Sequence, residues 1–196
     1  MIINTNVSAL NAWRNLGIQN NSMSSSLEKL SSGKRINKAA DDAAGLAISE
    51  KMISQINGLN ASVTNAQGGI TMIQTAEGAL NETTAILQRI KTLATLSSNG
   101  TQTDNDRGQT QKEVSQLTAE IDRIANTTSF NTKNLLDGKL STDFQIGAMK
   151  GQTMHAKIAT MTAAALSVNG LSLASVTKAM SAIAVLSKAI DKVSGE

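Results

Sequence analysis

Apolar residues near the start of the chain recur at three- and four-residue steps, which is the spacing of one face of an α-helix. This stripe consists of Leu10, Trp13, Leu16, Met23, Leu27 and Leu30. Asn6 is a good N-cap residue in front of the stripe, and Ser31, Ser32 and Gly33 favour a helix end behind it. The pattern therefore predicts a helix from about residue 6 to about residue 30, followed by a short polar connector.

A much longer helix is predicted from about residue 42 to about residue 98, where apolar positions follow the 3.5-residue period of a coiled-coil seam. The stripe runs through Ile56, Leu59, Val63, Ala66, Ile70 and Ile73, is interrupted at Glu77, and continues through Leu80, Leu87 and Ile90. Gly68 and Gly69 lie inside the stripe, and the close approach of another helix explains them better than a ligand does. The seam predicts partner helices packed tightly against this one.

Three further elements follow along the chain. Val114, Leu117, Ile121 and Ile124 predict a helix at about 104–126, and residues 126–140 are interpreted as a loop. Apolar residues alternate with polar ones on both sides of MKGQ, which predicts a β-hairpin at about 142–160. A last helix is predicted at about 172–194. The residues expected to form the packing seam between helices are Ile56, Leu59, Val63, Ile70, Ile73, Leu117, Ile121, Ile183, Leu186 and Ile190.

The fold class predicted from these elements is mainly α, with long antiparallel coiled-coil-like helices and a small β-hairpin in an elongated rod. Composition supports an elongated helical body, because the 196 residues include no Pro, no Tyr, 2 Phe and 1 Trp. No Cys is present, which excludes a disulfide framework and a thiolate site for metal or catalysis. The formal charge is +3, and the basic residues are scattered except around Lys34 to Lys38. No basic stripe with stacking aromatics therefore indicates nucleic-acid binding.

The segment MIINTNVSALNAW has neither a basic region nor an unbroken apolar run, so we expect no Sec-type signal peptide. No stretch approaches 18 consecutive apolar residues, so no membrane insertion is expected. Phosphate-binding loops, a GxSxG turn and an HExxH motif are all missing. We therefore expect no enzyme activity, no cofactor and no metal.

Two candidate sites have both a chemical and a structural interpretation. Asp41 and Asp42 could form an acid/base pair, but such a pair needs a pocket that separates its pKa values. Adjacent aspartates at the start of a long helix are better explained as caps of its free amides. His155 is the only histidine and is interpreted as a surface residue rather than a ligand. The dispersed methionines are interpreted as core filling rather than as a peptide-binding groove.

Several long motifs, in order along the chain, resemble the N-terminal region of bacterial flagellin. They are MIINTNVSALNAWRNL, KLSSGKRINKAADDAAGLAISEKM, GGITMIQTAEGALNETTAILQRIKTLA and EIDRIANTTSFNTKNLLDG, and FQIGAMKGQTM resembles the hairpin that follows. The resemblance implies a subunit that assembles with copies of itself into a helical tube, the extracellular filament used for motility. It also implies export through the channel of the flagellum.

The same resemblance implies three parts of the chain. Residues 1–33 would be half of an inner-tube coiled coil, residues 34–43 a connector and residues 44–196 the rod. Asp41 and Asp42 would then end the connector, cap the long helix and meet basic groups of neighbouring subunits. Family members also carry a second long return segment, whereas this chain ends at KAIDKVSGE. We therefore expect the stripe of residues 1–33 to be disordered alone or to pair between chains.

The rod of this family is also recognised by the animal innate receptor Toll-like receptor 5. The matching positions here are Arg89, Leu93 and Glu113, while Thr92 stands where an acidic residue is common. Two alternatives remain beside the filament subunit. One is the hook-filament junction protein, which shares the terminal helices, and the other is a helical receptor-binding fragment that does not polymerise.

Overall fold

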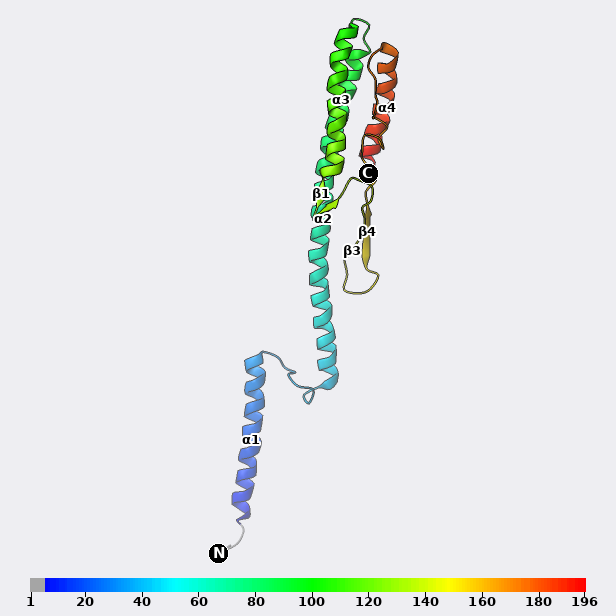
Figure 1. The fold of residues 1–196 in the computed structure, drawn as a ribbon. Helices are drawn as coiled ribbons and strands as arrows, with labels where there is room; N and C mark the ends of the chain where they lie inside the picture. Colours follow the sequence, from blue (N-terminus) through cyan, green and yellow to red (C-terminus); the bar gives the residue numbers. More distant parts are fainter. Residues whose placement is uncertain (1–5) are drawn as a thin grey trace. The chain divides into compact units, whose positions relative to one another are not determined.

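The computed structural model describes residues 6–196, which divide between Gly58 and Leu59 into two compact units (Figure 1). The described residues form four α-helices and two short antiparallel hairpins. The helices are α1 (Val7–Ser32), α2 (Ala43–Ser97), α3 (Asp104–Thr127) and α4 (Val176–Ser194). The strands are β1 (Ser129–Phe130), β2 (Lys133–Asn134), β3 (Ser141–Gln145) and β4 (Thr153–Lys157). The predicted fold class, mainly helical with a small hairpin, is confirmed.

The first unit contains α1, the connector and the first turns of α2. The Asn6 side chain accepts a hydrogen bond from the backbone N–H of Ala9, which satisfies one of the free amides at the start of α1. Gly33 ends the helix in the left-handed conformation, with φ +66°, which glycine adopts without a Cβ clash. The helix thus begins and ends close to where the sequence predicts.

The helix α2 has 55 residues and continues without a break through its glycines. Its buried residues begin at Ser62 and lie in the second unit. The prediction that another helix approaches closely is wrong for Gly69 in the described residues, and for Gly68 it stays a prediction. The ring of Phe144 on β3 covers Gly69, and no heavy atom lies within 4 Å of a Cβ added at Gly68. A glycine inside an apolar stripe indicates a close approach, but it does not tell which element approaches.

A capping box starts α3 and a buried arginine closes the turn before it. The side chains and backbone amides of Thr103 and Asp106 bond each other reciprocally. Arg107 is buried and donates through Nε to the carbonyl of Ser97 and through Nη2 to that of Asn99, at 3.0 and 3.1 Å. The bond to Ser97 satisfies a carbonyl group at the end of α2, and the bond to Asn99 holds the turn that follows the helix.

The interpretation of residues 126–140 as a loop is incomplete, because β1 and β2 pair there in a minimal hairpin. Its turn residues Asn131 and Thr132 both have positive φ, the conformation that two-residue hairpin turns require. The predicted hairpin at 142–160 is present as β3 and β4, in a register that places Asp143 opposite His155 and Phe144 opposite Met154. Polar residues without a clear alternation hid the smaller hairpin from the sequence pattern.

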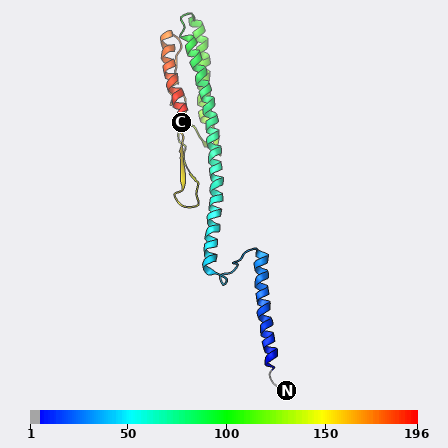
Figure 2. The same ribbon diagram turned by 180° about the vertical axis from the view of Figure 1, so that it is seen from behind.

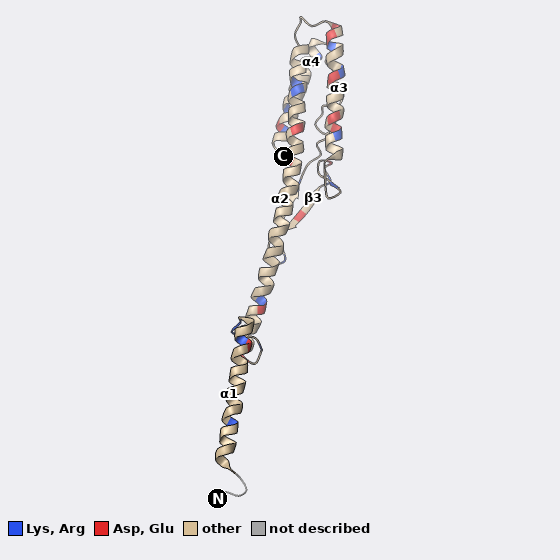
Figure 3. Ribbon diagram, turned by 90° about the vertical axis from the view of Figure 1, so that its left-hand side faces the viewer, with Lys and Arg blue, Asp and Glu red and all other residues tan. Residues whose placement is uncertain are grey.

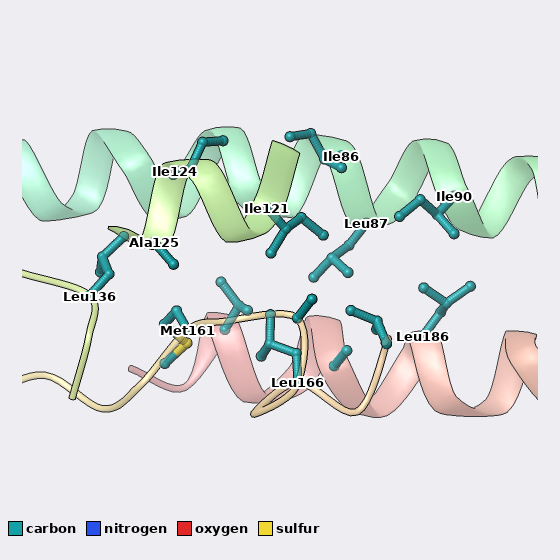
Figure 4. Packing of buried hydrophobic residues seen from close by; sticks show 14 of the residues in the cluster. Ile86, Leu87, Ile90, Ile121, Ile124, Ala125, Leu136, Met161, Leu166 and Leu186 are labelled. Carbon is teal, nitrogen blue, oxygen red and sulfur yellow. The ribbon is translucent and has the colours of Figure 1, made fainter. Parts of the chain in front are cut away.

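One hydrophobic core holds the second unit together. Figures 1 and 2 show α4 lying alongside the paired helices α2 and α3 in both views. Leu87, Ile121 and Leu186, one from each of these helices, are fully buried and point toward the common interior (Figure 4). Met161 and Leu166 fill the remaining side from the segment that joins β4 to α4.

The segment between β4 and α4 has no regular structure, and side chains of the helices hold it in place. Gln111 donates to the carbonyl of Leu171 at 2.9 Å and accepts from the amide of Leu173 at 2.7 Å. Asp122 accepts from the amide of Ala163 at 2.8 Å. Buried backbone polar groups require such partners, so these bonds allow an irregular segment to line the core.

Candidate assembly surfaces

The apolar stripe of α1 lies on the surface of the first unit. None of the helix's residues is buried, and Trp13 and Leu30 are 77% and 80% exposed. The other large apolar side chains exposed on α1 are Val7, Leu10, Leu16, Ile18, Met23 and Leu27. Contiguous apolar surface of this extent marks an interaction site, and an amphipathic helix gains most of its stability from the packing of that face.

The predicted seam on α2 has two different environments along its length. Leu87 and Ile90 are fully buried, and Leu80 packs against the core. The earlier residues of the same stripe are exposed by 41 to 56%; these are Ile56, Leu59, Val63, Ile70 and Ile73. Because these five side chains are exposed in the single chain, the prediction that they form a packing seam between helices stays a prediction. The packed face over this stretch contains Met72 and Ala76, and α3 and α4 pair with later turns of α2.

The seam residues contributed by the other helices do lie in the core. Ile121 and Leu186 are fully buried, and the partly buried residues packed beside them are Leu117, Ile183 and Ile190. The sequence analysis missed three exposed apolar residues at the start of α2, namely Ile48, Met52 and Ile53. Their spacing of four residues between Ile48 and Met52, and again to Ile56, was the signal that extends the exposed stripe toward the helix start.

Asp41 and Asp42 have different partners. Asp42 Oδ1 accepts from the amide of Gly45 at 2.9 Å and so caps α2, as expected. Asp41 does not cap the helix: its Oδ2 accepts from the amides of Asn37 and Lys38, and its Oδ1 pairs with Lys29 Nζ at 3.2 Å. The amide of Asn37, then Lys29 and the amide of Lys38, lower the pKa of Asp41 below its usual value. Both aspartates therefore serve the backbone of the joint, and the chemical interpretation gains no support from their surroundings.

The three receptor candidates are not equivalent in the structure. Arg89 on α2 binds Glu113 on α3 through Nε and Nη2, at 2.9 and 2.8 Å from the same oxygen Oε1. Both side chains are about half exposed, so this pair lies on the surface. Leu93 is only 5% exposed and belongs to the core. A surface formed by these helices would present the charged pair, while the Leu93 side chain supports the packing beneath it.

His155 Nδ1 lies 2.7 Å from Asp143 Oδ1 across the β3–β4 hairpin, and both side chains are more than half exposed. No serine or threonine of the described residues bonds the histidine, so no catalytic triad is assembled there. No group of three His, Asp or Glu in residues 6–196 could hold a metal ion. Within the same range, no helix is both long and apolar enough to cross a membrane.

An apolar groove of about 450 Å³ lies between α2 and β4 in the second unit. Its apolar lining is Ile73, Ala76, Leu80, Ala156 and Ile158, and the polar residues beside them are Glu77, His155, Lys157 and Glu196. One of the exposed seam residues, Ile73, thus forms part of this groove. Acidic and basic side chains are interspersed along α2 and α3 rather than separated by sign (Figure 3). The described surface therefore offers apolar stripes for packing.

Residues 3–141 match the family described as bacterial flagellin N-terminal helical region. The chain belongs to the bacterial flagellin family. It is 58% identical over 167 residues to a flagellin of Clostridium tyrobutyricum, which covers 85% of this chain and 43% of that relative. It is 50% identical over 210 residues to a flagellar filament 33 kDa core protein of Treponema phagedenis, covering 98% of this chain and 73% of the relative.

Two further comparisons indicate the same family. A flagellar filament core protein of Brachyspira hyodysenteriae is 48% identical over 210 residues, with 99% of this chain and 74% of that relative covered. Among solved structures, the flagellin of Bacillus cereus superposes with a TM-score of 0.58 at 28% identity, over 66% of this chain and 76% of that one. The chain thus spans between less than half and about three quarters of the length of these flagellins.

Proposed function

We propose that this chain is a structural subunit of the bacterial flagellar filament and that its exposed apolar stripes pack against copies of itself. The observation that carries the proposal is the seam of α2, which is core at Leu87 and Ile90 and open at Leu59 and Val63. Beside the packed face that contains Met72 and Ala76, α2 exposes further large apolar side chains, and this second apolar surface has room for another chain.

The test is polymerisation of the purified chain, started by short fragments of flagellin filaments and favoured by ammonium sulfate, which strengthens apolar association. Sedimentation and electron microscopy measure the product. The double substitution Leu59→Gln and Val63→Gln makes the open seam polar without touching the core. The matched control, Asn60→Gln and Thr64→Gln, changes exposed polar positions of the same turns.

Filaments from the unmodified chain and from the control, together with loss of filaments in the seam variant, are the expected result. Equal polymerisation of both variants would assign the contacts to another surface. A chain that stays monomeric under every seeding condition would contradict self-assembly and favour the alternative of a recognition fragment. Incorporation only at filament ends, at a low ratio to flagellin, would favour the junction protein.

Recognition by Toll-like receptor 5 is a second candidate, supported by the exposed Arg89–Glu113 pair on the surface shared by α2 and α3. Charge reversal can separate recognition from packing. Arg89→Glu or Glu113→Arg alone breaks the pair, whereas the two together restore an ion pair with the charges exchanged. If thermal stability recovers in the double variant while receptor binding stays lost, the receptor contacts the two charged side chains directly.

Binding that recovers with stability would mean that the pair acts only by joining the helices, and this outcome would remove it from the receptor surface. Leu93 needs separate treatment, since Leu93→Ala opens a cavity that costs about 2–5 kcal/mol whether or not a receptor is present.

We also infer export through the flagellar secretion channel, in keeping with membership of the family. Absence of the chain from the medium of a strain without that channel is the expected result.

A further inference from the structure

The connector between α1 and α2 is folded back on the last turns of α1 by side chains. Asn37 Nδ2 donates to the carbonyl of Glu28 at 3.3 Å and to Ser32 Oγ at 2.7 Å. Lys38 Nζ pairs with Glu28 Oε2 at 2.7 Å. The joint is therefore a defined turn whose contacts all lie within the first unit.

Asp41 lies in this turn and accepts from three of its donors. Lys29 of α1 forms an ion pair with Asp41, and the backbone amides of Asn37 and Lys38 in the connector donate hydrogen bonds to it. The ammonium group of Lys38 is also close enough to interact with it, although Glu28 is its direct partner. From α2, the neighbouring carboxylate of Asp42 is turned toward the amide of Gly45. Asp41 thus faces two lysines, and the acidic groups around it have their own partners.

We propose that Asp41 is an acid-sensitive latch, which ties the backbone of Asn37 and Lys38 to Lys29 of α1 when ionised and loosens that backbone when protonated. A neutral carboxyl group no longer attracts Lys29, and its protonated oxygen is a poorer acceptor for two amides that share Oδ2. One protonation therefore weakens three contacts together. The backbone of Asn37 and Lys38 then loosens, while the Asp42 cap of α2 and the bonds of Asn37 Nδ2 and Lys38 Nζ to Glu28 are separate contacts.

The direction of the pH dependence follows from the partners. The contacts of Asp41 lower its pKa in the folded turn relative to the ordinary value of 3.8. The latch is therefore fully engaged above that value and is lost as the pH falls through the lower pKa of the folded state. At the alkaline end, the hydrogen bond to Glu28 raises the pKa of Lys38 above 10.5, so that contact persists until the pH rises past it.

The experiment is an NMR titration of the full chain, following the backbone amides of Asn37 and Lys38 between pH 6 and pH 2. Both amide proton shifts are expected to follow a single titration, with a midpoint below the ordinary value for aspartate. In Asp41→Asn these two titrations disappear, and hydrogen exchange of the two amides at a fixed pH accelerates by about fivefold. Lys29→Gln is expected to move the midpoint upward while leaving the titration in place.

The matched control is Asp42→Asn, which removes the neighbouring carboxylate and leaves Asp41 intact. It is expected to change the amide of Gly45 and to leave the titration of Asn37 and Lys38 unaltered. A midpoint at the ordinary aspartate value, or exchange at residues 37 and 38 that is the same with and without the Asp41 carboxylate, would overturn the latch. Neither result bears on polymerisation, because every measurement is made on the monomer.

Discussion

The ring of Phe144 on β3 lies against the backbone of Gly69 on α2, where a Cβ would come within 3.2 Å of the ring carbons Cδ1 and Cε1. This contact fixes the hairpin on the long helix, together with a weaker bond from Asn65 Nδ2 to the carbonyl of Gln145. Only a residue without a side chain permits the ring to lie so close to the helix axis.

Replacement of Gly69 by Ala is expected to displace the ring of Phe144, while the same change at Gly68 meets open space. Gly68→Ala should raise the free energy of unfolding by about 1 kcal/mol through helix propensity alone. Gly69→Ala has the same propensity gain but loses aromatic packing. Its free energy of unfolding should therefore be lower than that of Gly68→Ala by at least about 1 kcal/mol. Urea unfolding of both variants measures the difference, and equal stabilities would show that the hairpin moves without cost.

Arg107 is expected to be one of the most sensitive polar residues of the second unit. Arg107→Met removes the donors to the carbonyls of Ser97 and Asn99 in a buried position, which should cost about 3 kcal/mol. Its ion pair with Asp104 contributes little, since the aspartate side chain is 96% exposed. Asp104→Asn should therefore stay within about 0.5 kcal/mol of the unmodified chain. A similar loss in both variants by chemical denaturation would assign the effect to the ion pair instead.

The two bonds of Gln111 can be separated with one isosteric change. Gln111→Glu keeps an acceptor for the amide of Leu173 and loses the donor to the carbonyl of Leu171. Gln111→Ala loses both bonds and should be the less stable variant, by about 1 kcal/mol. Gln109→Ala, at an exposed position of the same helix, is the control and should be nearly neutral. The Tm values from thermal denaturation rank the three variants. A higher Tm for Gln111→Ala than for Gln111→Glu would show that the bond from the amide of Leu173 does not stabilise the fold.

The capping box of α3 should make stability depend on acid. Asp106 Oδ2 accepts from Thr103 Oγ1 at 2.6 Å and from the Thr103 amide at 3.0 Å, and the hydroxyl, then the amide, lower the pKa of the carboxyl. Its stabilisation is present above the ordinary value of 3.8 and is lost as the pH falls through the lower folded value. The difference in Tm between the unmodified chain and Asp106→Asn should thus shrink between pH 6 and pH 2. A constant difference would show that the carboxylate charge is irrelevant to the cap.

Thr132 has φ +67°, a conformation that costs a residue with a Cβ about 1–2 kcal/mol. Thr132→Gly should relieve this strain and, after the extra chain entropy of glycine, stabilise the second unit by up to about 1 kcal/mol. Asn131→Gly, at φ 47°, should gain less, because asparagine tolerates the left-handed region. Equilibrium unfolding of the two variants provides the comparison, and a greater gain at residue 131 would show that the turn is not strained at Thr132.

The helices could be predicted from the sequence because apolar periodicity reports directly on which face of a helix avoids water. The same periodicity does not tell whether that face is covered by the same chain, which is why Leu87 and Val63 look alike in sequence and differ in burial. The roles of Arg107 and Gln111 could not be predicted, since each depends on carbonyl groups brought near by tertiary structure. Leu93 was interpreted from its position in a motif, and its place in the core became clear only from the packing.

The unequal burial along α2 has a consequence for how a second molecule would meet it. Forming the first turn of a helix is the costly step of helix formation, and lengthening an existing helix is much easier. The buried turns around Leu87 and Ile90 anchor α2 independently of any partner. The open turns near Leu59 therefore act as an extension of a helix that has already nucleated. A second chain that packs on these turns would therefore meet a surface that is already helical, and its binding would require no separate helix nucleation in α2.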